Sequence, residues 1–404
     1  MSDSVSNRGL PLTTRGALVL AAFATALAFS IILPNLPSRI AAVSGFDDPA
    51  TISRHTGLMT AAYTAAIFVS APFLGRISDG WGRRPVLILG LAGFSTSLML
   101  FELAGDLLLL YTARALAGVS AAAITPVALA TVGDWSPDDG WRARRFAWIG
   151  AATMIGFMVG PLLGGTLSIL SSKQAQLETG APLFWPIMLA LVSACVIAQT
   201  VPVSKRPSSS HANAYARRGA DDQRTSKSLL VLAAIVAGSV AAFDVHLALR
   251  GNLGFGASGL TIGLMLAECS AVMLLAQTLV FSPLVPPKAT RWLIAPALGM
   301  LGLALGLASA ATTAAALALG VGAIATAAGI AAPIITYWTS LIAGEHQGED
   351  LGRWIAVTSL GQAVGSAAAG LLLSHGLSNT MFTIASALAL VGVIIAAWLA
   401  KRLA

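Results

Sequence analysis

Three ionisable side chains lie inside long stretches of sequence that carry almost no other charge. Glu268 lies near the midpoint of one apolar run, Asp244 lies in the run before it, and Arg114 lies in a run of the first half. Surroundings of low dielectric disfavour the charged form of a carboxyl group, so such a group can take up and release a proton near physiological pH. The pattern therefore predicts proton transfer within an apolar interior.

Each of these side chains has a plainer alternative. For Asp244 it is a pair with Arg250 near the end of the run, and for Glu268 it is a buried acid that stays neutral. Arg114 must face a cavity or a partner, because an arginine inside a membrane costs about 2.5–3.5 kcal/mol on insertion scales, or it must extend to the headgroups. Glu268 is the first choice for the proton carrier, since Asp244 lies nearer to water.

A short glycine-rich segment, Gly-Arg-Ile-Ser-Asp-Gly-Trp-Gly-Arg-Arg-Pro, runs from Gly75 to Pro85 between two apolar runs. The glycines, Gly82 among them, permit a tight turn. Asp79 is placed to accept backbone N–H groups near a helix N-terminus, where the helix dipole favours negative charge. The alternative is an ordinary basic cytoplasmic loop.

A second glycine string lies in the fifth apolar run. Small residues let membrane helices approach closely, and proline bends the backbone. A fainter copy, Gly-Gln-Ala-Val-Gly, begins at residue 361. The alternative is ordinary helix packing. The string consists of Gly156, Gly160, Pro161, Gly164 and Gly165.

The composition shows which elements must position these residues. Of 404 residues, 56% are hydrophobic and only 10% are charged, whereas a soluble domain is about 25% charged. The mean hydropathy is +0.80. These values exclude a cytosolic enzyme, a secreted domain and a disordered chain. They predict an all-α membrane protein, with the two cysteines, Cys195 and Cys269, inside apolar runs and no disulfide framework or metal site.

Charged residues divide the chain into apolar runs long enough to span a bilayer. The two longest runs each hold two helices, with turns near 311–313 and 374–380. The prediction is twelve transmembrane helices in two six-helix bundles: 1–203, then a cytoplasmic linker over 204–227, then 228–404. The runs are Gly16–Ser38, Thr56–Gly75, Pro85–Phe101, Leu107–Val132, Phe146–Ser172, Thr179–Ser204, Ser228–Leu249, Gly251–Pro287, Trp292–Gly344 and Trp354–Ala400.

The net charge of +7 reflects basic residues concentrated on one side of this topology. With the N-terminus inside, 19 Lys and Arg residues fall in cytoplasmic segments and four fall outside. The positive-inside rule then places both termini in the cytoplasm of a multi-pass protein of the cell membrane. The basic excess is explained without a nucleic-acid partner.

The segment between the second and third runs resembles the signature loop of the major facilitator superfamily, and the six–linker–six layout resembles that family over essentially the whole chain. The resemblance implies a conformational latch against the other half. It assigns this role to Gly75, Asp79, Gly82, Arg83 and Arg84.

Two further motifs are similar to those of the drug/proton antiporters, the tetracycline and multidrug efflux group. The glycine string of the fifth run resembles their antiporter motif and favours export. Arg114-Ala-Leu-Ala-Gly118 resembles a fourth-helix motif linked to proton coupling, although Ala117 replaces the usual glutamine. The resemblance thus adds Arg114 to Glu268 and Asp244 as candidates for proton coupling.

The prediction is a proton-coupled secondary transporter, not an enzyme, that exports small amphipathic compounds as a monomer. It uses the proton gradient as its energy source and no cofactor, and ATP drive has no support because there is no Walker sequence. The alternatives are a metabolite or siderophore exporter, an uptake symporter and, in a different class, a non-transporting membrane receptor. Polar and aromatic candidates for a central cavity are Asn35, Tyr63, Thr125, Gln277, Tyr337, Trp338 and Gln362.

Overall fold

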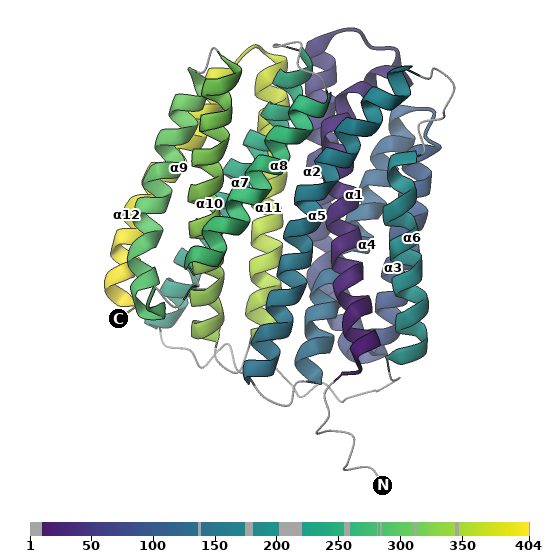
Figure 1. Ribbon diagram of the computed structural model, residues 1–404. Helices are drawn as coiled ribbons and strands as arrows, with labels where there is room; N and C mark the ends of the chain where they lie inside the picture. Colours follow the sequence, from purple (N-terminus) through teal and green to yellow (C-terminus); the bar gives the residue numbers. More distant parts are fainter. Residues whose placement is uncertain are drawn as a thin grey trace.

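The computed structural model describes residues 10–135, 139–173, 181–201, 220–253, 259–280, 282, 285–310, 313–343 and 347–403, apart from some side chains near helix ends. Twelve helices in these ranges are long and apolar enough to cross a membrane. Figure 1 shows them standing roughly parallel in one bundle. They are α1 (Leu12–Ser44), α2 (Pro49–Trp81), α3 (Arg83–Glu102), α4 (Leu107–Asp134), α5 (Asp139–Lys173), α6 (Ala181–Thr200), α7 (Ala220–Leu253), α8 (Gly259–Val280), α9 (Ile294–Ser309), α10 (Ala314–Ala343), α11 (Gln347–Ser374) and α12 (Ser378–Arg402), with a short 3₁₀ helix, η2, over Pro287–Leu293.

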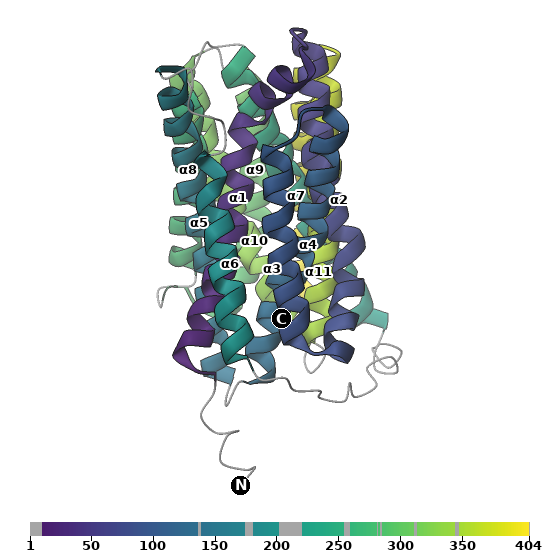
Figure 2. The same cartoon turned by 90° about the vertical axis from the view of Figure 1, so that its right-hand side faces the viewer.

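The buried residues form two separate cores. One core is built from α1 to α6, and the other from α7 to α12. Among the described residues of the first half, Leu33 of α1 alone belongs to the second core. The expected all-α fold with two six-helix bundles is therefore confirmed (Figures 1 and 2). Helix α1 begins and α12 ends on the same side, called here the terminal side, and the opposite side is the far side.

The helices extend beyond the uncharged runs from which they were predicted. Helix α2 begins at Pro49 because Asp48 caps it, accepting the backbone N–H groups of Ala50 and Thr51 at 3.2 and 3.0 Å. Charge marks where a helix leaves the apolar layer, whereas a cap marks where the helix ends. Both predicted turns in the second half agree with the helix bounds, since α9 ends at Ser309 and α10 begins at Ala314, and α11 ends at Ser374 and α12 begins at Ser378.

The predicted linker lies mostly outside the described residues. Helix α7 already includes its last part, from residue 220 onward. This part of the sequence is polar, yet it is helical. The first turns of α7 extend beyond the apolar layer, where a helix needs no apolar face.

Helix α5 packs on α1 through the predicted glycine string. An added Cβ at Gly156, Gly160 or Gly164 would lie 2.8–2.9 Å from a backbone oxygen of α1, too close for any side chain. These oxygens belong to three residues spaced four apart, so the two helices stay in contact over two turns. Ser30 of α1 also donates a hydrogen bond of 3.0 Å to the Gly156 oxygen. The three glycines contacted in this way lie against Phe23, Leu27 and Ile31; the surroundings of Gly165 lie outside the described residues.

The second half repeats this packing on the corresponding helices. Gly361 and Gly365 of α11 lie against the backbone of Ala234 and Gly238 of α7. The faint sequence echo therefore has a physical basis, because α11 needs the same close approach to α7 that α5 needs to α1.

We predict that Gly160→Leu destabilises the protein by about 1–3 kcal/mol or more, because the added side chain has no space and must push α5 away from α1. The measurement is the midpoint of thermal unfolding of the purified protein in detergent. Gly150→Leu is the matched control in the same helix, since a Cβ there meets no atom within 4 Å. Equal midpoints for the two variants would contradict the packing role of Gly160.

Candidate functional site

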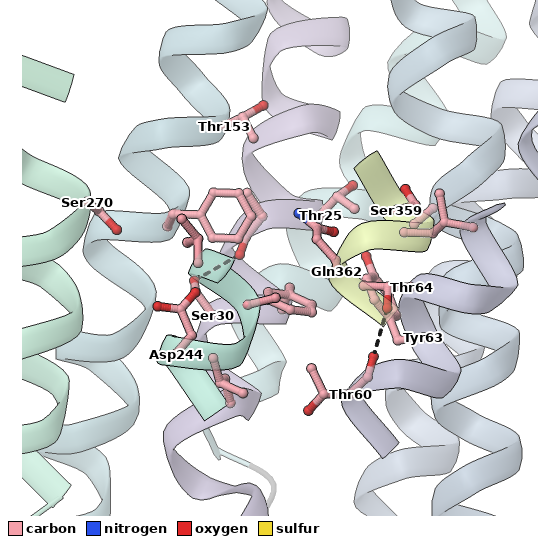
Figure 3. A pocket seen from close by; sticks show the side chains of 18 of the residues that line it. Thr25, Ser30, Thr60, Tyr63, Thr64, Thr153, Asp244, Ser270, Ser359 and Gln362 are labelled. Carbon is pink, nitrogen blue, oxygen red and sulfur yellow. Dashed lines mark hydrogen bonds between the residues drawn. The ribbon is translucent and has the colours of Figure 1, made fainter. Parts of the chain in front are cut away.

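A cavity of about 350 Å³ lies between the two halves. Helices α1, α2, α4 and α5 line it from the first half, and α7, α8 and α11 from the second. Most of the lining is apolar, with hydroxyl groups distributed around it (Figure 3). Its polar side chains are Thr25, Ser30, Thr60, Tyr63, Thr64, Thr125, Thr153, Asp244, Ser270, Ser359, Gln362 and Ser366.

Asp244 is the only carboxylic acid among the residues that line this cavity, and none of them is a lysine or arginine. Helix α7 presents Asp244 together with Val240, Ala241 and Val245. Figure 3 shows Asp244 on one side of the cavity and Gln362 and Tyr63 on the other. The alternative pair with Arg250 involves a side chain outside the described residues. The cavity is therefore suited to an apolar guest with a positive charge.

Arg114 lies behind the cavity wall. Its side chain is buried, at 2% exposure, so it does not extend to the headgroups. The guanidinium carbon lies 4.6 Å from the ring centroid of Tyr63 and 5.4 Å from that of Phe29, and both rings line the cavity. A desolvated cation–π contact contributes about 2 kcal/mol. No carboxylate of the described residues forms an ion pair with Arg114, so its charge is held by the two rings.

Glu268 does not line the cavity, although α8 contributes four neighbouring residues to it. Its Oε1 atom instead faces Gly322 of α10, where an added Cβ would lie 3.6 Å away. How deep a residue lies in the membrane and which way its side chain points around the helix are independent. The choice of Glu268 over Asp244 from the sequence rested on depth alone. The role of either carboxyl group in proton coupling stays a prediction.

Three of the seven predicted cavity residues line the cavity: Tyr63, Thr125 and Gln362. The other four lie elsewhere. Asn35 donates to the Ile31 oxygen at 2.9 Å and packs beside Gly164. Trp338 is buried in the second core and donates to Thr290 at 3.1 Å, and the ring of Tyr337 packs edge to face against it. Gln277 is half-buried on α8.

Most of the hydroxyl groups of the cavity were not predicted from the sequence. A signal was present in α2, where Thr56, Thr60 and Thr64 recur every four residues on one helix face. Thr60 and Thr64 line the cavity, and each of the three hydroxyls bonds a backbone oxygen of its own helix.

The glycine-rich segment from Gly75 to Pro85 is a helix junction rather than an extended turn. Helix α2 continues to Trp81 and α3 begins at Arg83, so Gly82 alone forms the break, with a φ of +97°. The expected cap by Asp79 is absent, since α3 has no side-chain cap. Because Asp79 lies in the last turn of α2, its carboxylate meets a side chain instead of backbone N–H groups.

Arg83 connects three groups at this junction. It contacts Asp79 at 2.6 Å, Asp134 at the end of α4 at 3.0 Å, and Ser78 at 2.5 Å. Arg84 is half-buried, and an added Cβ at Gly75 would meet open space. The predicted residues thus join α2, α3 and α4 of one half on the terminal side.

The two halves touch closely near the far side. Gly57 of α2 lies directly against Gly370 of α11: an added Cβ at Gly57 would lie 2.6 Å from the Gly370 Cα, and one at Gly370 would lie 2.7 Å from the Gly57 Cα. Helices α5 and α8 form a second contact between the halves. The structure therefore has a tight backbone contact between its halves on the far side of the cavity.

Comparison with known proteins agrees with this architecture. The family model of the Major Facilitator Superfamily matches residues 18–341, and the chain belongs to this family. It is 27% identical to Multidrug resistance protein 2 of Bacillus subtilis (strain 168), over 87% of this chain and 86% of that protein. It is 31% identical to the class B Tetracycline resistance protein of Escherichia coli, over 46% of this chain and less than half (43%) of that one.

Solved structures show the same fold at low sequence identity. The human organic anion transporter MFSD10 (TETRAN) has a TM-score of 0.74 and 21% identity, covering 96% of this chain and all of that one. A peptide transporter POT in complex with alafosfalin has a TM-score of 0.75 and 13% identity, covering 99% and 97%. These likenesses show the fold, and the match to the family makes the protein a membrane transporter rather than an enzyme.

We predict that Gly57→Leu keeps the far side open, because the new side chain has no space against Gly370. Cys269, which lines the cavity, reports this in a Cys195→Ser background. A membrane-impermeant methanethiosulfonate added from the far side should label Cys269 several-fold faster in the variant. Gly16→Leu, at a position with no atom within 4 Å, is the control. Unchanged labelling at equal expression would show that the contact does not control access.

Proposed function

We propose that this chain is a proton-coupled efflux antiporter for small amphipathic compounds that carry a positive charge. The observation that carries the proposal is the position of Asp244, the single carboxylic acid in an otherwise apolar and hydroxyl-lined cavity between the halves. The names of the relatives, multidrug and tetracycline resistance proteins, support export of such compounds.

The mechanism follows from competition for one carboxyl group. Asp244 binds either a proton or the positive group of the substrate, and the low dielectric of the cavity disfavours leaving it charged and empty. Each return of the empty transporter then carries a proton inward, so the proton gradient drives export without a cofactor. Arg114 stays behind the rings of Tyr63 and Phe29, where its charge does not pair with Asp244.

The orientation and the latch belong to the same proposal. The terminal side, with most of the Lys and Arg residues, faces the cytoplasm of a cell membrane, and the transporter works as a monomer. The Asp79–Arg83 pair holds the cytoplasmic ends of α2 and α3 in the shape that favours one of the alternating conformations. An uptake symporter, a metabolite or siderophore exporter and a receptor are the alternatives that the next experiment separates.

We predict that Asp244→Asn abolishes accumulation of a lipophilic cation in inside-out vesicles with an imposed pH gradient, while wild type accumulates it. The amide cannot exchange a proton for a cation. Asp47→Asn, which removes an exposed carboxylate from a far-side loop, is the control and should behave as wild type. Accumulation by Asp244→Asn would remove Asp244 from the mechanism. Wild-type accumulation only under the reverse gradient would indicate uptake, and none under either gradient would favour a receptor or a different substrate.

We predict that Asp79→Asn strongly reduces the transport rate without loss of membrane insertion, because Arg83 loses one of its two carboxylate partners. The measurement is the initial rate per folded protein, judged by size-exclusion chromatography. Arg76→Gln, a charge removal on the exposed side of the same turn, should keep the rate. A wild-type rate in Asp79→Asn would refute the latch.

A further inference from the structure

Helix α8 presents Glu268 on the side opposite the cavity. At about 100° per residue, Glu268 shares a face with Leu264, Leu275 and Leu279, whose side chains are 53–63% exposed. The residues of α8 that line the cavity lie on the other face: Leu266, Cys269, Ser270 and Met273. In a membrane-spanning helix the exposed face contacts lipid, so Glu268 is a carboxyl group on the lipid side of the protein, near the middle of the span.

The missing side chain of Gly322 makes room for this carboxyl group in a notch between α8 and α10. Toward the terminal side the notch is closed, because Gly329 of α10 lies against the backbone of Met273. The Glu268 side chain is half-buried there. It forms no hydrogen bond or ion pair with another described residue.

A charged carboxylate next to hydrocarbon is costly, so such groups nearly always face a cavity or a partner. Glu268 is stable in this position either protonated or paired with a cation. Lipid headgroups lie about 15 Å away, half the thickness of the hydrocarbon layer. A second copy of the chain offers no cation from its described residues either, since Arg114, the one Lys or Arg inside the apolar runs, is buried. The partner that fits is a cation with an apolar body that dissolves in the bilayer.

We propose that Glu268 and the notch beside Gly322 form a lipid-facing site for amphipathic cations, separate from the cavity. The proposal rests on the proposed function, because the same compounds are the cargo. On binding, the O–H bond of the Glu268 carboxyl group breaks, the proton passes to water at the interface, and the carboxylate pairs with the cation. The site thereby concentrates cargo from the bilayer at the surface of the transporter.

The test is the binding stoichiometry of tetraphenylphosphonium on the full-length protein in lipid nanodiscs, with empty nanodiscs subtracted. We expect two binding sites per chain in wild type and one in Glu268→Gln. The lost site is the lipid-facing one, where a proton and the cation compete for the Glu268 carboxyl group. Gly322→Leu, which fills the notch and keeps the acid, should also lose one site. Thr278→Val, on the exposed face of α8, is the control and should keep both.

The possible outcomes separate this proposal from the proposed function. Two sites in Glu268→Gln, or a wild-type particle of two chains that becomes one chain in this variant, would overturn the lipid-facing site. In parallel, Asp244→Asn should lose the other site and keep the one at Glu268. If Asp244→Asn retains both sites while Glu268→Gln retains one, the lipid-facing site stands and the proposed exchange at Asp244 fails.

Discussion

Close contact between helix backbones is the constraint on which the rest of this structure depends. Lipid is as apolar as the helix surfaces, so helices associate through van der Waals contact rather than through the hydrophobic effect. Here α5 meets α1, and α11 meets α7, at glycines that admit no side chain. These contacts fix the rotation of each helix about its axis. With Gly361 against α7, for example, the next residue, Gln362, is turned toward the cavity.

The rotation of the helices gives the acids and the buried arginine different environments. Asp244 faces hydroxyl groups and apolar side chains from both halves, whereas Glu268 faces lipid and a glycine notch. Arg114 is almost fully buried, yet the rings of Tyr63 and Phe29 separate it from the cavity. A guanidinium inside the cavity would repel a cationic guest or neutralise Asp244. Its position behind the wall avoids both effects.

The sequence predicts well which residues lie inside the membrane, and it predicts poorly which way their side chains point around the helix. This difference explains why the spans were located and most of the cavity lining was not. Charge spacing located the apolar runs, and the division of the two longest runs into the helix pairs α9–α10 and α11–α12 followed from length alone. Whether Glu268 or Asp244 faces the interior depends on the rotation of each helix about its axis, which in turn depends on contacts such as Gly329 with α8 and Gly361 with α7. The rings of Tyr337 and Trp338 pack in the second core and are not among the residues that line the cavity, because a core and a cavity wall need similar side chains.

The contact between the halves uses the same close backbone packing at glycines as the contacts within them. Within the first half, a hydrogen bond from Ser30 to the Gly156 oxygen joins α1 and α5. At the contact of Gly57 with Gly370, the hydroxyls of Ser53 and Thr56 bond oxygens of their own helix. In lipid, a polar group that loses its partner costs several kcal/mol. Because the Ser53 and Thr56 hydroxyls bond oxygens of α2 itself, opening the Gly57–Gly370 contact leaves both of these hydroxyls paired, and the halves can separate there without that cost for either group.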